Sequence, residues 1–164
     1  MEKFYQFLAD HHIEYERHDH PAVYTVEEAE RLVPPLPGAK SKNLFFRDKK
    51  GNRHFLVVVS AKKRVNIKAL PDVVGSTRLT FGSPRRLEKY LGVEPGAVTL
   101  MAIFNDADQN VEVFIDRELW ESKAFNFHPL VNTSTLVISR KNLQRFIDAT
   151  GHAIQVVDVP GQKD

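Results

Sequence analysis

Two lysines and an asparagine stand immediately before the first strongly apolar segment of the chain. Lys40, Lys42 and Asn43 precede residues 44–46, Leu-Phe-Phe, which predict a strand with these polar side chains at its shoulder. An anchored lysine ammonium is a compact cation suited to a phosphate, and an asparagine amide can hold a hydroxyl or a base edge. Taken alone, the two lysines are better explained as solvated loop charges, so the hypothesis of an anion site depends on the rest of the chain.

A second polar stretch spans residues 127–135. Its His128, Asn132 and Thr133 offer hydrogen-bonding groups beside apolar neighbours, and Pro129 restricts the backbone between them. Such a stretch could hold a small ligand. Taken alone, the stretch is better explained as a loop whose polar side chains satisfy their own backbone.

A third candidate is the turn at residues 93–99. Gly96 and the small Ala97 would let a ligand approach the main chain closely, and Val98 and Thr99 follow them. Free backbone amides in such a turn can stabilise an oxyanion. The alternative is a helix-to-strand connection that simply needs its glycine.

The composition excludes several kinds of chemistry. The chain contains no cysteine, which excludes disulfides, thiolate metal sites and thiol nucleophiles. No Gly-x-Ser-x-Gly sequence indicates a serine nucleophile. His18 and His20 would share one face of a strand, but a polar turn before Pro21 explains them better than a metal site does.

Length, composition and net charge limit the classes of protein to which the chain can belong. The 164 residues fit one domain, 1–164, and 42% hydrophobic residues with eleven Phe can build a substantial core. A net charge of +2 is too mild to indicate a nucleic-acid binder by itself. No segment resembles a signal peptide or a membrane span, so we expect a soluble cytoplasmic protein. Three local basic clusters indicate a polyanionic partner: Lys62, Lys63, Arg64 and Lys68; Arg85, Arg86 and Lys89; Arg140, Lys141 and Arg145.

Periodicity and capping residues predict the elements that must position these groups. Helices are expected over about 2–11, from the cap at Thr25 to Leu32, from the cap at Ser83 to Gly92, and from the cap at Ser139 to Gly151. Strands are expected over 44–47 and 54–60 as one hairpin, 78–81, 98–104 and 111–115 as a second hairpin, 135–138, and 153–159. The continuous apolar run at 57–59 predicts burial on both faces. The pattern predicts an α+β fold with a mixed, curled or barrel-like sheet surrounded by helices.

Taken together, these stretches resemble the YbaK family, the editing domains associated with prolyl-tRNA synthetase. The chain is most similar to its free-standing editing proteins of the PrdX type, which remove alanine mischarged onto proline tRNA. The likeness runs in order over about residues 10–155. Its matching stretches are residues 20–29, 42–46, 91–99, 104–106 and 127–133, followed by Gly151-His152.

The resemblance implies a role for each matching residue. Lys42 is similar to the family's essential lysine, which holds the phosphate of the terminal adenosine, and Asn43 to a neighbour that contacts the substrate end. Gly96 begins the loop whose amides face the aminoacyl group, and His128 lines the amino-acid pocket. Predicted substrate contacts are Ala97, Val98, Thr99, Asn132 and Thr133, and predicted tRNA contacts are Lys40, Arg85, Arg86 and Lys89.

The resemblance also implies how the reaction proceeds and with what partners. An aminoacyl ester is already activated, so the enzyme would hold it, exclude bulk solvent and present one water to the carbonyl carbon, without metal or cofactor. The expected partner is the acceptor end of a mischarged tRNA, with prolyl-tRNA synthetase as an optional second partner and a monomer as the favoured state. Membrane association is not expected.

One departure from the family pattern keeps alternatives open. The family's loop usually reads Gly-x-x-x-Pro, and Leu100 stands at its fifth position here. This change could alter the amino acid that is accepted, such as serine or cysteine instead of alanine. It could also indicate a module that binds tRNA or a synthetase without hydrolysis. A metal-dependent hydrolase is a third possibility.

Overall fold

The computed structural model describes residues 1–162. Its strands are β1 (Glu16–Asp19), β2 (Ala39–Arg47), β3 (His54–Ser60), β4 (Thr80–Phe81), β5 (Val111–Asp116), β6 (Ala124–Phe127), β7 (Ser134–Ser139) and β8 (Ile154–Val157). Its α-helices are α1 (Glu2–Asp10), α2 (Val26–Leu32), α3 (Leu70–Val74), α4 (Pro84–Leu91), α5 (Arg117–Trp120) and α6 (Arg140–Thr150). Two short 3₁₀ helices, η1 (Pro95–Ala97) and η2 (Leu100–Asn105), follow α4.

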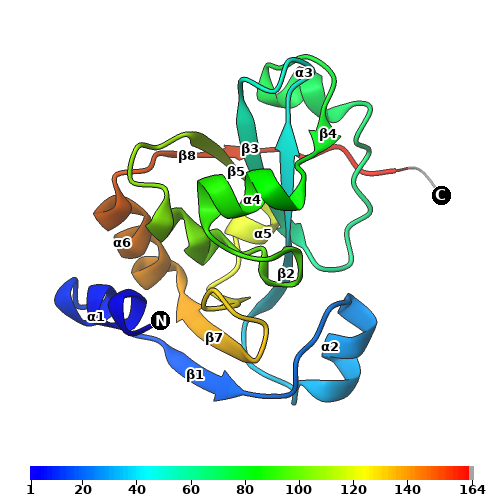
Figure 1. Cartoon of the computed structure of the whole chain (residues 1–164). Coiled ribbons are helices and arrows are strands. Elements are labelled where there is room, and N and C mark those ends of the chain that lie inside the picture. Colours follow the sequence, from blue (N-terminus) through cyan, green and yellow to red (C-terminus); the bar gives the residue numbers. More distant parts are fainter. Residues whose placement is uncertain (163–164) are drawn as a thin grey trace.

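The strands form one mixed sheet in the order β1-β7-β6-β2-β3-β5-β8, with β4 added beside β2. Strand β2 joins the two halves of this sheet (Figure 1). Its first residues, Ala39 and Lys40, pair in parallel with β6, and its residues from Ser41 to Arg47 pair antiparallel with β3. The predicted α+β class with a mixed sheet and surrounding helices is confirmed.

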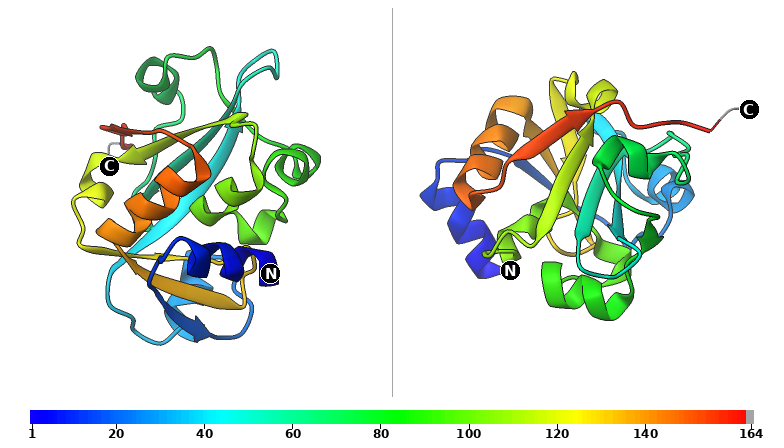
Figure 2. Two further views of the ribbon diagram at one scale, coloured as in Figure 1. Left: turned by 90° about the vertical axis from the view of Figure 1, so that its left-hand side faces the viewer. Right: turned by 90° about the horizontal axis from the view of Figure 1, so that it is seen from above.

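Both faces of the central strands are buried. Leu56 and Val58 face a core built with α1, α4, η2 and α6, whereas Val57 and Val59 face a smaller core built with α3 and the segment before β4. Helices α1 and α6 lie side by side over the first of these faces (Figure 2). The predicted double-sided burial of residues 57–59 is therefore confirmed, and it fixes β2 and β3 as the rigid centre of the molecule.

Side-chain caps begin the helices where the sequence predicted them. The hydroxyl oxygens of Thr25, Ser83 and Ser139 accept hydrogen bonds from backbone amides three residues on, at 3.0–3.2 Å. Gly92 and Gly151 end α4 and α6 with positive φ angles of 65° and 81°. A left-handed residue at this position closes a helix, and glycine adopts it without steric cost.

The predicted hairpin of residues 98–104 with 111–115 is wrong. Residues 100–105 form the 3₁₀ helix η2, which begins after Thr99, whose hydroxyl accepts from the Met101 amide at 3.2 Å. Strand β5 pairs in parallel with β3 and β8 instead. Leu100 to Ile103 are all buried, and a short, fully buried apolar run does not distinguish a strand from a helix.

Candidate functional site

A small hollow of about 90 Å³ opens where β2 leaves β6. We call it the first hollow. Its walls come from α2, the proline-rich loop after α2, the start of β2 and the end of β6, and most of its surface is apolar. Its lining residues are Val26, Ala29, Val33, Pro34, Leu36, Lys40, Ser41, Asn43, Ala61, Asn126, Phe127, His128 and Thr135.

Asn43 presents a donor to this hollow. Its Oδ1 accepts a hydrogen bond of 2.9 Å from the backbone amide of Leu100. An amide N–H can only donate, so this contact fixes which end of the Asn43 side chain is oxygen. The Nδ2 group has no protein partner within residues 1–162, and it is free to donate to a ligand.

His128 presents an acceptor to the same hollow. Its Nδ1 lies 3.0 Å from the carbonyl oxygen of Ser134, which can only accept, so Nδ1 carries the proton. Burial lowers the pKa of His128, with His20 adding to this effect and the Ser134 hydrogen bond opposing it. The ring is therefore neutral near pH 7, and Nε2 keeps its lone pair.

Thr99 and Leu100 hold both of these groups in place. The Thr99 side chain is fully buried, and its hydroxyl donates to the His128 carbonyl oxygen at 2.7 Å. The next residue, Leu100, donates to Asn43. Two consecutive residues thus fix Asn43 and His128. Thr99 was predicted as a substrate contact, and the structure places it behind the hollow as a support.

Thr135 and His20 form a polar pair at the hollow that sequence reasoning missed. His20 Nδ1 donates to the Pro21 carbonyl oxygen at 2.8 Å, so its Nε2 accepts from the Thr135 hydroxyl, also at 2.8 Å. Alternation along the 134–139 strand could have pointed to Thr135. Across the described residues, no group of three or more His, Asp or Glu side chains is arranged to hold a metal ion.

Gly96, Ala97 and Asn132 line a second, wider hollow of about 310 Å³ together with Tyr24. A Cβ at Gly96 would lie 2.8 Å from the Tyr24 ring, which explains the glycine by close packing. The Ala97 amide donates to the Glu94 carbonyl oxygen at 2.9 Å and is not open to an oxyanion. The structure therefore separates the Gly96 turn from the hollow that contains Asn43 and His128.

Lys42 lines neither hollow. It stands opposite Val59 on β3, and directly paired residues share one face of a sheet, so its side chain lies on the other face of β2 from Asn43. Partial burial lowers the pKa of Lys42, and the charge of Arg64 adds to the shift. No carboxylate pairs with Lys42 within the part of the chain that the structure describes. Lys40 is exposed and lines the first hollow.

The remaining predicted contacts are dispersed. Val98 lines neither hollow, and Thr133 borders a separate depression near the N-terminus. Arg85 is exposed, whereas Arg86 donates to the Gly51 carbonyl oxygen at 3.0 Å. The Lys89 ammonium lies 5.2 Å from the centre of the Tyr90 ring.

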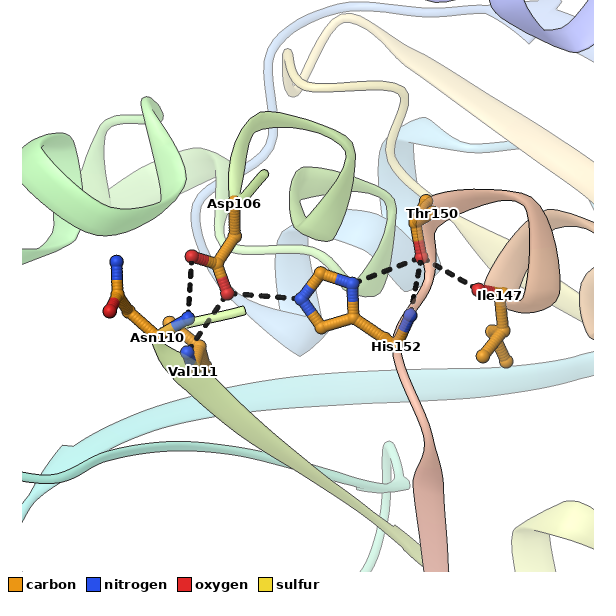
Figure 3. Close-up of polar contacts among 6 residues, drawn as sticks. All are labelled: Asp106, Asn110, Val111, Ile147, Thr150 and His152. Atoms are coloured by element: carbon orange, nitrogen blue, oxygen red, sulfur yellow. Dashed lines mark hydrogen bonds and ion pairs between the residues drawn. The ribbon is translucent and has the colours of Figure 1, made fainter. Parts of the chain in front are cut away.

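A buried hydrogen bond between Asp106 and His152 supports η2 from behind (Figure 3). Asp106 and His152 have side chains only 2–3% exposed, with 3.0 Å between Oδ2 and Nε2. The carboxylate also accepts from the amides of Asn110 and Val111 at 2.9 Å. Burial acts to raise the pKa of Asp106, but the hydrogen bonds from His152 and these two amides outweigh it and lower that pKa.

The fold is similar to that of several solved structures. A structure described as a putative trans-editing enzyme for prolyl-tRNA synthetase superimposes with a TM-score of 0.66 at 18% identity, covering 95% of each chain. Such a likeness establishes the α+β architecture.

No helix within residues 1–162 has the length and apolar character needed to span a membrane.

The chain belongs to the aminoacyl-tRNA editing domain family, whose model matches residues 20–146. It is 37% identical over 147 residues to the prolyl-tRNA editing protein ProX of Acetoanaerobium sticklandii, covering 90% of both chains. It is also 36% identical over 149 residues to the prolyl-tRNA synthetase associated domain-containing protein 1 of Danio rerio, covering 90% of this chain and 80% of the relative. The resemblance found in the sequence is confirmed at the level of the family.

Proposed function

We propose that this protein is a trans-editing deacylase that hydrolyses the ester of mischarged tRNA, with alanine on proline tRNA as its main substrate. The observation that carries the proposal is the first hollow, where an open amide donor on Asn43 and an open imidazole acceptor on His128 face one small space. Membership of the editing family supports it. We place the activity in the cytoplasm, with the tRNA acceptor end as substrate and prolyl-tRNA synthetase as an optional partner.

In this proposal the chain mainly orients the ester. Asn43 Nδ2 donates to the carbonyl oxygen as negative charge develops there, and such a fixed donor is worth about 2.7–4 kcal/mol in known oxyanion holes. His128 Nε2 accepts a proton from the attacking water while the water oxygen bonds to the carbonyl carbon. A neighbouring ribose hydroxyl of the tRNA helps to place this water. As the ester C–O bond breaks, the proton passes from His128 to the departing ribose oxygen, which gives free alanine and uncharged tRNA.

We assign selection against proline to the walls of the first hollow, which are mostly apolar. Apolar contacts alone discriminate by only about 1–3 kcal/mol per methylene, so rigid exclusion must reject the ring. The walls that would do this are the buried Asn126 and Phe127 of β6 and the more exposed Pro34 and Leu36 of the loop after α2.

Lys42, Lys40 and the remaining predicted residues lie outside the first hollow or at its rim, and in this proposal they contact other parts of the tRNA or shape the surrounding loops. Lys42 binds the phosphate of the terminal adenosine, which agrees with a partly buried ammonium that has no acidic partner within residues 1–162. Lys40 stands at the rim. Gly96, Ala97, Val98, Asn132 and Thr133 shape the outer loops, and Arg85, Arg86 and Lys89 lie toward the acceptor stem.

A panel of mischarged tRNAs tests the function directly. Proline tRNA charged with alanine, serine, cysteine or proline is incubated with the protein, and release of the free amino acid is measured. We expect the fastest release for alanine and none for proline. Binding without release of any amino acid would instead establish a binding module.

The pH dependence of activity should report on His128. Because the pKa of His128 is lowered from its ordinary value of 6.5, Nε2 stays unprotonated at pH 7 and gains a proton only as the pH falls below that value. We expect kcat/KM to stay level down to about pH 6.5 and to fall below it. His128→Gln should abolish this acid limb. The substrate's amino group titrates equally with both enzymes, so an unchanged limb would assign it to another group.

Leu100→Pro should weaken the hold on Asn43. Thr99 is already extended, with φ −153° and ψ 148°, so a proline can follow it, but the donor to Asn43 is lost. One hydrogen bond is worth about 0.5–1.5 kcal/mol, so we expect kcat/KM to fall by about 2- to 10-fold and the preference among alanine, serine and cysteine to change. Leu100→Ala is the matched control, because it shortens the side chain and keeps the amide. Identical effects of both substitutions would reduce Leu100 to a core residue.

A further inference from the structure

A second surface, at the opposite end of β2 from the first hollow, gathers the positive charge of this chain. It consists of the β2–β3 turn (residues 47–53), the segment 76–81 and the start of α4 (residues 83–89), and we call it the basic end. Its three segments contain eight Lys or Arg and two Asp or Glu. The rest of the chain holds 15 of the 23 basic and 19 of the 21 acidic residues, so it is net negative.

Hydrogen bonds hold the three segments together. The Lys49 amide donates to the Thr77 hydroxyl at 3.1 Å, and Arg86 donates to the Gly51 carbonyl oxygen at 3.0 Å. Strand β4 pairs with the end of β2, which places Phe81 opposite Phe46. The basic end is therefore a fixed surface, and it lies at the hairpin end of β2 (Figure 1).

Most of this charge is open to a partner. Asp48 is buried and accepts from the amides of Asn52 and Arg53 at 2.8 and 3.1 Å, so it serves the turn. Arg53 is paired with Glu112. Five exposed cations remain, and none of them pairs with a carboxylate within residues 1–162: Lys49, Lys50, Arg78, Arg85 and Lys89.

An exposed aromatic ring lies within the same surface. Phe81 is 54% exposed, whereas Phe46 beneath it is fully buried, and their rings stack with centres 4.7 Å apart. One face of Phe81 is thus fixed by the core and the other is open. An open aromatic face among cations suits nucleic acid, because bases stack on the ring while phosphates meet the charges.

We infer that the basic end binds the acceptor arm of tRNA, with phosphates of the stem on the exposed cations and an unpaired base stacked on Phe81. This inference rests on the proposed function. From Lys40 at the first hollow to Phe46, six residues of β2 span about 20 Å at about 3.3 Å per residue. The short unpaired 3′ end of the tRNA would bridge this length.

Binding of uncharged proline tRNA, followed by fluorescence anisotropy over a range of salt concentrations, tests the inference. The triple variant Lys49→Glu, Lys50→Glu, Arg78→Glu should bind at least 10-fold more weakly at 0.15 M salt. Its slope of log affinity against log salt should become shallower by about 2–3, since each lost phosphate contact removes about 0.7–0.9. The matched control reverses three exposed lysines elsewhere, Lys3, Lys123 and Lys141, and should bind nearly as the wild type does.

Variants of Phe81 test the stacking contact separately in the same binding measurement. Phe81→Ala should weaken binding about 5- to 100-fold, and Phe81→Leu, which keeps an apolar side chain without the ring, should not restore it. Alanyl-adenosine has no stem, so every variant should hydrolyse it at the wild-type rate. Wild-type affinity in the triple variant would overturn the inference, and so would a loss confined to binding of prolyl-tRNA synthetase. If the wild type binds tRNA in this way but releases no amino acid, the proposed function fails and the inference stands.

Discussion

Replacing Lys42 with alanine is expected to reduce kcat/KM on alanyl-tRNA by about 100-fold or more while leaving the fold intact. Removing one partner of a partly buried, hydrogen-bonded charge pair costs about 2–5 kcal/mol, and 1.4 kcal/mol corresponds to tenfold. The free protein loses little, because Lys42 has no carboxylate partner within residues 1–162. Single-turnover deacylation gives the rate, and thermal unfolding confirms the fold.

Lys40→Ala is the decisive comparison, because the two lysines stand at different places. Lys40 lines the first hollow with Asn43, whereas Lys42 lies on the other face of β2. We expect a large loss for Lys42→Ala, a small one for Lys40→Ala and partial recovery in Lys42→Arg. The reverse order would transfer the phosphate contact from Lys42 to Lys40.

Asp106→Asn is expected to lower the free energy of unfolding by about 3 kcal/mol at pH 7. Both carboxylate oxygens accept backbone amides, and Oδ2 also faces His152, so an asparagine must turn an NH₂ group toward a donor. A buried donor left without its acceptor typically costs about 1–3 kcal/mol, and more where a charged group is involved. Urea unfolding measures the change, and Asp108→Asn at an exposed site two residues on should have little effect.

The same variant should change the dependence of stability on pH. The pKa of Asp106 is lower in the folded state than its ordinary value of 3.8, so its contribution is complete above that value. It is lost as the pH falls through the lower folded-state pKa. The stability difference between wild type and Asp106→Asn should therefore shrink as the pH falls through the lowered pKa of Asp106. A difference that grows in acid would contradict the lowered pKa.

Local signals in the sequence predicted much of the fold. Caps at Thr25, Ser83 and Ser139 and the glycines that end α4 and α6 were correct, because each is a contact between near neighbours. The parallel pairing of β5 with β3 and β8 was missed, since it joins segments far apart in the chain. Strand β6 and the short helix α5 were also missed, although residues 124–127 form part of the first hollow's wall.

The candidate site shows the same division. Asn43 and His128 were predicted from the sequence, and the structure places both at one hollow. The hydrogen bond from Leu100 to Asn43 could not be predicted. It joins residues 57 positions apart, and its donor is a backbone amide, which every residue except proline has. The placement of Lys42 and Asn43 on opposite faces of β2 could have been predicted, since consecutive residues of a strand point to opposite faces.

Strand β2 begins at the first hollow and ends in the turn of the basic end, and it is paired with β3 from Ser41 to Arg47. Because β2 is rigid, the distance between the basic end and the first hollow is fixed. The ester would reach the hollow only when the single-stranded 3′ end of the tRNA has the matching length, so a tRNA with one nucleotide more or fewer at that end would not be hydrolysed.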